Sequence, residues 1–170
     1  YTFTATLGAT PRLFFHNTTN AYVYDTGTGI VAVTDIDYPA STVPGCVWLD
    51  GTTYVMDSDA YIYGSDLNDP TSWNSLNKIQ AQIEADQGMG LARQLSYVLA
   101  FKQWSTEVFY NAANATGSPL ARQTGSKLNY GCYNGKTIVD IDGVIYWLAQ
   151  TRSGALMVVS LTNLTPTVVS

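Results

Sequence analysis

The chain has 170 residues, of which 46% are hydrophobic and only 12% charged, and its formal net charge is −5 at pH 7. That length allows one domain with a buried core, whereas the acidic balance argues against a nucleic-acid clamp, which needs a basic face to release counterions. An acidic channel past which DNA slides is compatible with it. No apolar run approaches the roughly 20 residues of a membrane span.

The first part of the chain consists of short apolar runs separated by turn residues. Residues 1–7 alternate aromatic or apolar side chains with threonine, which is the period of a half-buried strand. Turn-rich tetrads at 17–20 and 26–29 separate the next runs, and Pro39 and Pro44 mark a crossing to a second unit. The strands expected in this first part are residues 1–7, 13–15, 21–24 and 30–33.

The segment 46–63 predicts a compact antiparallel unit. An apolar run is interrupted at Asp50-Gly51, resumes to Met56, turns at the acidic triplet 57–59 and returns over 60–63. We therefore expect short strands joined by tight turns.

The next segment is less regular in pattern. Residues 64–73 are expected to form a loop, because Asn68-Asp69-Pro70 is strong turn chemistry. Residues 76–86 alternate with period 2 throughout, which favours a strand. A short helix is the alternative, since Ile79 and Ile83 are also four residues apart.

The rest of the chain continues with strand-length apolar runs between turn residues, and residues 87–90 are expected to lead into the next hairpin. The strands expected here are residues 96–101, 106–111, 120–124, 127–130, 137–141, 144–149, 155–161 and 165–169.

The plan of the unit at 46–63 recurs at a fixed spacing. Asp50-Gly51 precedes Tyr54 as Asp142-Gly143 precedes Tyr146, and 142 − 50 = 92, which is twice 46. The midpoint, residue 96, falls in a third hairpin of the same shape. One antiparallel unit per 40–50 residues is typical of propeller blades.

We therefore predict an all-β fold of antiparallel meander blades, a single β-propeller domain that is either whole or part of a larger propeller. Residues 50, 96 and 142 should occupy equivalent places in successive blades. Four side chains are predicted to be buried between sheets: Val55, Val98, Ile145 and Trp147. The expected blade-like units are at about 1–44, 45–90, 91–136 and 137–170.

Three D-x-D pairs are candidates for metal binding or acid–base chemistry, because positions i and i+2 share a face of an extended segment. The alternative is that they are turn and strand-end residues, which we favour because nothing supplies the six or more oxygens that Ca²⁺ requires. The pairs are Asp35 with Asp37, Asp57 with Asp59, and Asp140 with Asp142.

His16 is the only histidine, so a nucleophilic triad would have to use it, but no G-x-S-x-G motif accompanies it. We expect an ordinary surface histidine at a strand end. Cys46 and Cys132 show no metal-ligand spacing and are expected to be small buried residues, with a disulfide as the alternative.

Pairs of aromatic residues could stack on sugars, although alternating tyrosines on strands more often serve packing or interfaces. These are Tyr22/Tyr24, Tyr61/Tyr63 and Phe109/Tyr110. A sialidase-like hydrolase is disfavoured, because its S-x-D-x-G-x-T-W turn is matched only imperfectly and once, at 65–73, and no arginine cluster is present.

Four strings carry a resemblance to a known family: LNDPTSW at 67–73, STEVFYN at 105–111, GC at 131–132 and DGVIYWL at 142–148. In this order and at about these separations they resemble the tail hub, or nozzle, proteins of short-tailed bacteriophages. These are also called packaged-DNA stabilisation proteins or tail accessory factors. The STEVFYN string is the most specific, and the resemblance covers about residues 45–160.

The resemblance implies a non-enzymatic virion protein of the phage tail: a β-propeller subunit in a ring, expected to contain six copies, that extends the portal channel, retains packaged DNA and lets it pass on ejection. The implied partners are further copies, portal or adaptor proteins, tail fibres, spikes or a needle, and double-stranded DNA without sequence-specific contacts. We expect no catalytic, cofactor or metal residues and no membrane partner. A carbohydrate- or receptor-binding β-propeller module is the alternative.

Overall fold

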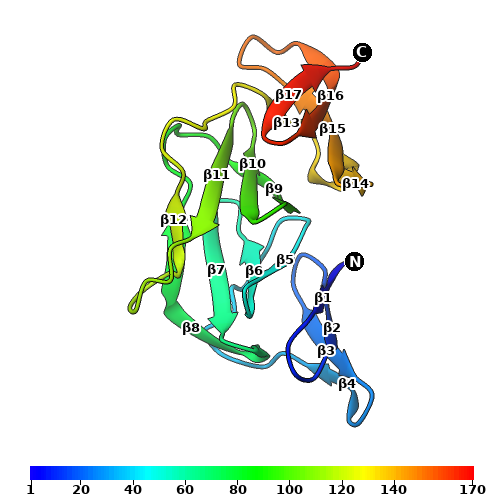
Figure 1. Ribbon diagram of the computed structural model, residues 1–170, viewed down its shortest axis with the longest axis vertical. Helices are drawn as coiled ribbons and strands as arrows, with labels where there is room; N and C mark the ends of the chain where they lie inside the picture. The colour runs from blue at the N-terminus through cyan, green and yellow to red at the C-terminus, as the bar shows by residue number, and fades with distance from the viewer.

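The computed structural model describes residues 1–170 and contains seventeen β-strands and one short 3-10 helix, gathered into four antiparallel sheets (Figure 1). The predicted all-β fold of antiparallel meanders is thereby confirmed. Short runs of Val, Ile, Thr and Tyr suit pleated strands, and tight turns join most consecutive strands into hairpins. No helix is long and apolar enough to cross a membrane.

The strands of each sheet follow one another in chain order, except near the start of the fourth. The first sheet holds β1 (Thr2–Thr6), β2 (Arg12–His16), β3 (Ala21–Asp25) and β4 (Gly29–Ala32). The second holds β5 (Val47–Leu49), β6 (Thr52–Met56), β7 (Tyr61–Asp66) and β8 (Asp69–Gln80). The third holds β9 (Gly88–Gln94), β10 (Tyr97–Lys102), β11 (Thr106–Asn111) and β12 (Leu120–Arg122).

The fourth sheet has a divided inner edge. Its order is β13 (Gly131–Cys132), β15 (Val144–Gln150), β16 (Leu156–Thr162) and β17 (Thr165–Val168). The strand β14 (Val139–Ile141) also pairs with β15, further along the same strand, and the 3-10 helix η1 (Gly135–Thr137) connects β13 to β14.

The four sheets follow one another along an arc, from the blue first sheet to the orange and red fourth sheet, with the N-terminus on its open side (Figure 1). The first strands lie along the inner side, because β1 contacts β5, β5 contacts β9, and β9 contacts η1. Sheets stacked about an axis with their first strands innermost are the architecture of propeller blades.

The core is a series of three layers, one between each pair of neighbouring sheets. Alternate residues of one strand serve two layers, as β6 shows: Val55 packs toward the first sheet, while Tyr54 and Met56 pack toward the third. The strand β10 behaves likewise, and the predicted burial of the four core side chains is confirmed. Those residues are Val55, Val98, Ile145 and Trp147.

Residues 50, 96 and 142 each lie in a two-residue hairpin turn of their sheet, as the spacing predicted: β5–β6, β9–β10 and β14–β15. The turn of the middle sheet is offset by one residue relative to the other two turns. Asp50 and Asp142 are left-handed with φ of 49° and 52°, but the left-handed residue of the middle turn is Leu95. The repeat is therefore structural, although its exact register is not 46 residues at every step.

The prediction of a loop over residues 64–73 was wrong. Residues up to Asp66 belong to β7, a tight turn at Leu67-Asn68 follows, and β8 begins at Asp69. Asn68 adopts the left-handed conformation (φ 61°), which asparagine tolerates. Pro70 fits because β8 is an outer strand that pairs only with β7.

Two further strand boundaries differ from expectation. Within 76–86 a strand is correct and the helix is not, but β8 ends at Gln80 and residues 81–87 form an irregular connection. In the expected strand 127–130, only Leu128 forms an isolated bridge, to Thr106.

The strand β9 was not expected. Gly88 and Gly90 suggested a connection, but a Cβ at Gly88 would lie 2.4 Å from the carbonyl oxygen of Asp57. Glycine is required here by close packing between sheets rather than by a turn.

Candidate functional site

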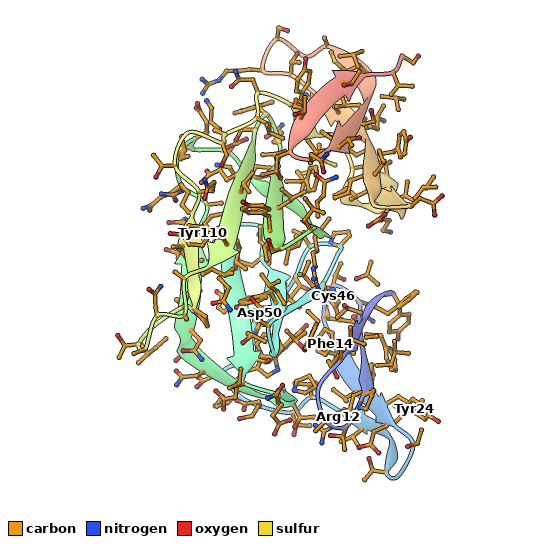
Figure 2. All side chains as sticks on the ribbon, in the orientation of Figure 1. Arg12, Phe14, Tyr24, Cys46, Asp50 and Tyr110 are labelled. Carbon is orange, nitrogen blue, oxygen red and sulfur yellow. The ribbon has the colours of Figure 1, made fainter.

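The inner side of the arc encloses a hollow of about 630 Å³ that is lined by residues from all four sheets or the segments entering them. Cys46 projects toward this inner side, as Figure 2 shows. The lining is contributed by β1, β9, η1, β14, the start of β15 and the segment before β5. It is the place where any ligand or passing chain would meet every sheet of the protein.

Two glycines let the backbones at this inner edge approach closely. A Cβ at Gly45 would lie 1.9 Å from the carbonyl oxygen of Leu91, and one at Gly135 would lie 1.9 Å from that of Met89. Gly45 also has a φ of 98°, which L side chains rarely adopt. These contacts join the second sheet to the third and the third to the fourth.

The charge of the hollow differs from that of the whole chain. Its charged lining residues are Arg93, Lys136 and Asp140, so the acidic excess of the sequence is not concentrated here. Arg93 donates to the carbonyl oxygens of Trp48 and Leu95, at 2.8 and 2.7 Å, and is held against the neighbouring sheet.

The size of the hollow limits what it can hold. It holds about 630 Å³, whereas the major groove of B-DNA alone is about 12 Å wide and about 8.5 Å deep. The hollow is therefore smaller than a DNA duplex.

His16 is not at the surface, so that expectation was wrong. The side chain is buried between the first sheet and the segment entering the second. Its Nε2 lies 2.8 Å from Thr2 Oγ1 and 3.0 Å from the Gly45 carbonyl oxygen, and its Nδ1 lies 2.9 Å from Thr42 Oγ1. Burial lowers the pKa of His16, so the neutral ring is favoured and acts as a structural bridge.

The two cysteines are free thiols, which contradicts the disulfide alternative. Cys132 is buried as expected, whereas Cys46 is only partly buried at the hollow. Burial raises the pKa of Cys46 to about 12 and that of Cys132 to about 11. Neither thiol is therefore activated as a nucleophile at neutral pH.

The first aspartate of each D-x-D pair accepts hydrogen bonds from nearby groups. Asp57 accepts from the backbone N–H of Tyr61 and from the hydroxyl of Tyr63, both at 2.9 Å. Asp140 accepts from the N–H of Gly143 at 2.8 Å. These partners are the local turn and strand groups that the turn interpretation expects.

Asp35 plays a similar part between sheets. It accepts from the N–H of Asp37 and from the N–H of Trp73 in β8, both at 2.9 Å. These backbone bonds lower the pKa of Asp35 and fix the crossing segment on the second sheet. No group of three or more His, Cys, Asp or Glu residues is arranged to hold a metal ion.

A buried ion-pair network joins the second and third sheets. Lys102 Nζ lies 2.8 Å from both Asp86 Oδ1 and Glu107 Oε1, and all three side chains are fully buried. The same ammonium donates to two backbone carbonyls in the connection 81–87. Arg122 Nε lies 2.8 Å from Glu107 Oε2, so two cations face two carboxylates. The network fastens the connection onto β10 and β11.

A buried glutamine joins the third and fourth sheets. Gln94 Nε2 donates to the carbonyl oxygens of Leu161 and Gly143, at 2.6 and 3.1 Å. Its Oε1 accepts from the N–H of Leu164 at 3.0 Å. Sequence reasoning missed both this residue and the ion-pair network, although a lone Lys or Glu inside an apolar strand is a readable signal.

Of the aromatic pairs, only Tyr22/Tyr24 lies on an open sheet face. Lys78 Nζ lies 5.1 and 5.5 Å from the ring centroids of Tyr61 and Tyr63, over both rings. Phe109 is buried, while its neighbour Tyr110 is exposed. Tyr24 projects from the first sheet on the side away from the second (Figure 2), which suits an interface rather than a sugar subsite.

The strings behind the family resemblance lie at structural junctions. Trp73 packs between the first and second sheets, against Phe14 and edge-on to Tyr38 with centroids 4.9 Å apart. Glu107 anchors the ion-pair network, and Trp147 donates to the Gly131 carbonyl oxygen at 2.8 Å. Each string thus supplies a residue that joins one blade to the next.

Comparison with known proteins agrees with this placement. The family model described as bacteriophage P22 Gp10, β-propeller, a phage stabilisation family, matches residues 9–170. No curated protein matches the chain. The matched region includes β2 to β17 and therefore parts of all four sheets. The chain belongs to the bacteriophage P22 Gp10 β-propeller family of phage tail and DNA stabilisation proteins.

Proposed function

We propose that this protein is a non-enzymatic structural component of a phage tail hub or nozzle, which extends the portal channel, retains packaged DNA and lets it pass on ejection. The observation that carries the proposal is the family match over residues 9–170. The proposed role needs no catalytic groups, and the buried polar side chains described above join one sheet to the next.

The proposed working form is a ring of copies, six in number as the resemblance implies. DNA would pass through the centre of that ring, because the hollow inside one chain is too small for a duplex. A net charge of −5 keeps phosphates from binding tightly, which suits a wall that must release DNA quickly. Rigid joints such as the Lys102 network suit a part that withstands the pressure of packaged DNA.

We further propose one domain composed of the blade-like units at about 1–44, 45–90, 91–136 and 137–170. The four sheets support this division, with the third and fourth beginning slightly earlier, at Gly88 and Gly131. The proposed neighbours in the virion are the portal or adaptor on one side and fibres, spikes or a needle on the other.

The test is a phage whose copy of this gene is deleted, compared with the same phage complemented by the wild-type chain. We expect deletion particles to fill with DNA and then lose it, measured as nuclease-accessible DNA, and complementation to restore retention. Imaging of complemented virions should locate the protein in the tail. Deletion particles that retain DNA normally, or a protein located away from the tail that binds glycans specifically, would contradict the proposal.

A further inference from the structure

Lys102, Asp86 and Glu107 bring an amine and two carboxyl groups into contact away from water. Lys102 Nζ lies 2.8 Å from Asp86 Oδ1 and 2.8 Å from Glu107 Oε1, and none of the three side chains is accessible to solvent. Lys102 ends β10 and Glu107 lies on the adjoining strand β11, whereas Asp86 belongs to the connection 81–87. The contact therefore joins an irregular segment to the end of a hairpin.

The two oxygens of the Asp86 carboxyl group have different surroundings. Oδ2 accepts from the backbone N–H groups of Trp104 and Ser105, at 2.8 and 3.1 Å. Oδ1 faces Lys102 Nζ, and the Ser105 hydroxyl lies 3.2 Å from both oxygens. Two backbone N–H groups aimed at one oxygen stabilise the negative charge that develops there when a nucleophile attacks the carboxyl carbon. The Asp86 carboxyl group is thus prepared to accept a nucleophile.

The nucleophile and a proton carrier are also in place. Charged groups are costly to keep away from water, so burial favours transfer of a proton from the Lys102 ammonium to the Asp86 carboxylate, which gives a neutral pair. A desolvated neutral lysine is a nucleophile. Glu107 can carry the next proton, and its carboxylate is oriented by Arg122 Nε and by the N–H of Ile83, both at 2.8 Å.

We propose that Lys102 and Asp86 join in an intramolecular amide bond, with Glu107 as the proton carrier. The neutral Nζ attacks Cγ of the protonated carboxyl group, and negative charge gathers on Oδ2. Glu107 takes a proton from Nζ and gives it to the Oδ1 hydroxyl, which leaves as water. The Nζ–Cγ bond forms, the Cγ–Oδ1 bond breaks and the Glu107 carboxylate is regenerated, so the reaction needs no other reactant.

The bond fastens the connection 81–87 covalently to β10. It links residues that are 102 − 86 = 16 positions apart, and such a cross-link stabilises a fold mainly by restricting the unfolded chain. The exclusion of water from the site protects the product from hydrolysis. The inference rests on the contacts around Lys102 and does not depend on the tail role.

Mass spectrometry of the purified and then denatured chain tests for the bond. We expect wild type to weigh one water molecule less than its sequence. Trypsin should not cleave after Lys102, and the peptide 94–122 should remain attached to the peptide 79–93. The pair of Lys127 and Glu84 is an internal control, because its N–O distance is 2.7 Å but its side chains are 28% and 27% exposed. Cleavage after Lys127 should therefore be normal.

Two substitutions separate the reaction from the packing. Glu107→Gln keeps the shape of the side chain but cannot carry the proton, so a folded variant should form the linked peptide at least about a hundredfold more slowly. Circular dichroism checks that this variant is folded. Asp86→Asn keeps the carbon that is attacked and releases ammonia instead of water. This second variant should therefore reach the same final mass as linked wild type.

A folded wild type with the full mass of its sequence, and with the peptides 79–93 and 94–102 released separately, would overturn the proposal and leave the three groups as an ion-pair network. A water lost at another site, such as Asp50-Gly51, would also leave those peptides separate and would overturn it. An unchanged rate in Glu107→Gln would overturn the role given to Glu107. None of these results would affect the proposed tail role.

Discussion

The second and third sheets are covered on both faces, whereas the first and fourth are covered on one. In the inner sheets every residue of β6 is buried, and so are five of the six residues of β10. In the end sheet, β15 alternates strictly between buried and partly exposed positions. The outward positions of the first sheet are nevertheless apolar, unlike the polar ones of a solvated antiparallel sheet. Those of the fourth are mixed, because apolar residues alternate there with Gln150, Ser160, Thr162, Thr165 and Thr167. The difference teaches that the first sheet has the side-chain composition of a blade with a neighbour on each side, whereas the fourth does not.

The inner sheets also carry the buried charges, and the end sheets do not. A buried ion pair is costly to form but far more costly to break, because the remaining partner is left uncompensated in a low dielectric. The connection 81–87 has no regular structure of its own, so the Lys102 network is what holds it between sheets. Buried ion pairs are therefore concentrated at the centre of the arc, whereas the outer joints use uncharged polar groups such as those of His16 and Gln94.

The largest effect is expected from removing the central ammonium. Lys102→Ala leaves Asp86 and Glu107 buried with only Arg122 nearby, and should lower the free energy of unfolding by about 3–5 kcal/mol. Urea denaturation measures this change. Lys136→Ala, at an exposed lysine, is the matched control and should have only a small fraction of the effect. Equal effects at the two sites would show that the inner network does not stabilise the fold.

Substitutions at two adjacent residues of β15 compare the stability contributed by its covered face with that contributed by its free face. Trp147→Ala removes a ring packed 5.1 Å from that of Phe101 and the donor to the Gly131 carbonyl, and should cost about 3–5 kcal/mol. Tyr146→Ala, one residue away on the free face of β15, should cost less than half as much. A near-neutral Trp147→Ala would remove that residue from the core.

Adding a single methyl group at the inner edge of the sheets should destabilise the fold. Gly45→Ala places a Cβ against the Leu91 carbonyl, and overpacking of this kind costs about 1–3 kcal/mol in addition to the backbone strain at positive φ. Gly143→Ala is the control, because Gly143 also has a positive φ (79°) but has nothing within 4 Å of the added atom. The difference between the two variants in thermal unfolding isolates the clash. Equal losses would mean that strain alone accounts for both.

The sequence was sufficient to predict the all-β class, the propeller repeat and the four core side chains, because these depend on period-2 alternation and turn spacing. It was not sufficient for β9, where glycines that permit close backbone contact were interpreted as a connection. The same contact explains why Gly45 and Gly135 carried no recognisable signal: their partners lie about 46 residues away in the chain, at Leu91 and Met89.

The site residues were harder to predict because their contacts also join segments that are distant in the sequence. The burial of His16 depends on Thr2, Thr42 and Gly45, which come from three separate segments, so no local pattern shows it. The role of Glu107 could have been suspected from its place inside the apolar string TEVFYN of β11. Its partner Lys102 lies on the neighbouring strand β10 of the same hairpin. The contact of Lys102 with Asp86 could not have been predicted, since it forms only where the connection 81–87 packs on this sheet.

The smallest expected effect is a pH dependence at the joint between the first and second sheets. The pKa of folded His16 is below its ordinary value of 6.5, because burial disfavours the charged ring. The unfolded chain therefore binds the additional proton first as pH falls through about 6.5. The free energy of unfolding should be greatest above pH 6.5 and should decrease below it, by at most about 1.4 kcal/mol per pH unit, until the folded pKa is passed.

His16 is the only histidine, so few other groups titrate between pH 7.5 and 5.5. A difference between wild type and a His16 variant over this range therefore reports on His16. Urea unfolding of wild type across that range should show the decrease, whereas His16→Gln should show a nearly flat profile whatever its absolute stability. A wild-type profile as flat as that of the variant would mean that the ring is accessible to solvent and that the joint between the end sheet and its neighbour opens. A steep profile would show that this joint is closed, as the inner ones are.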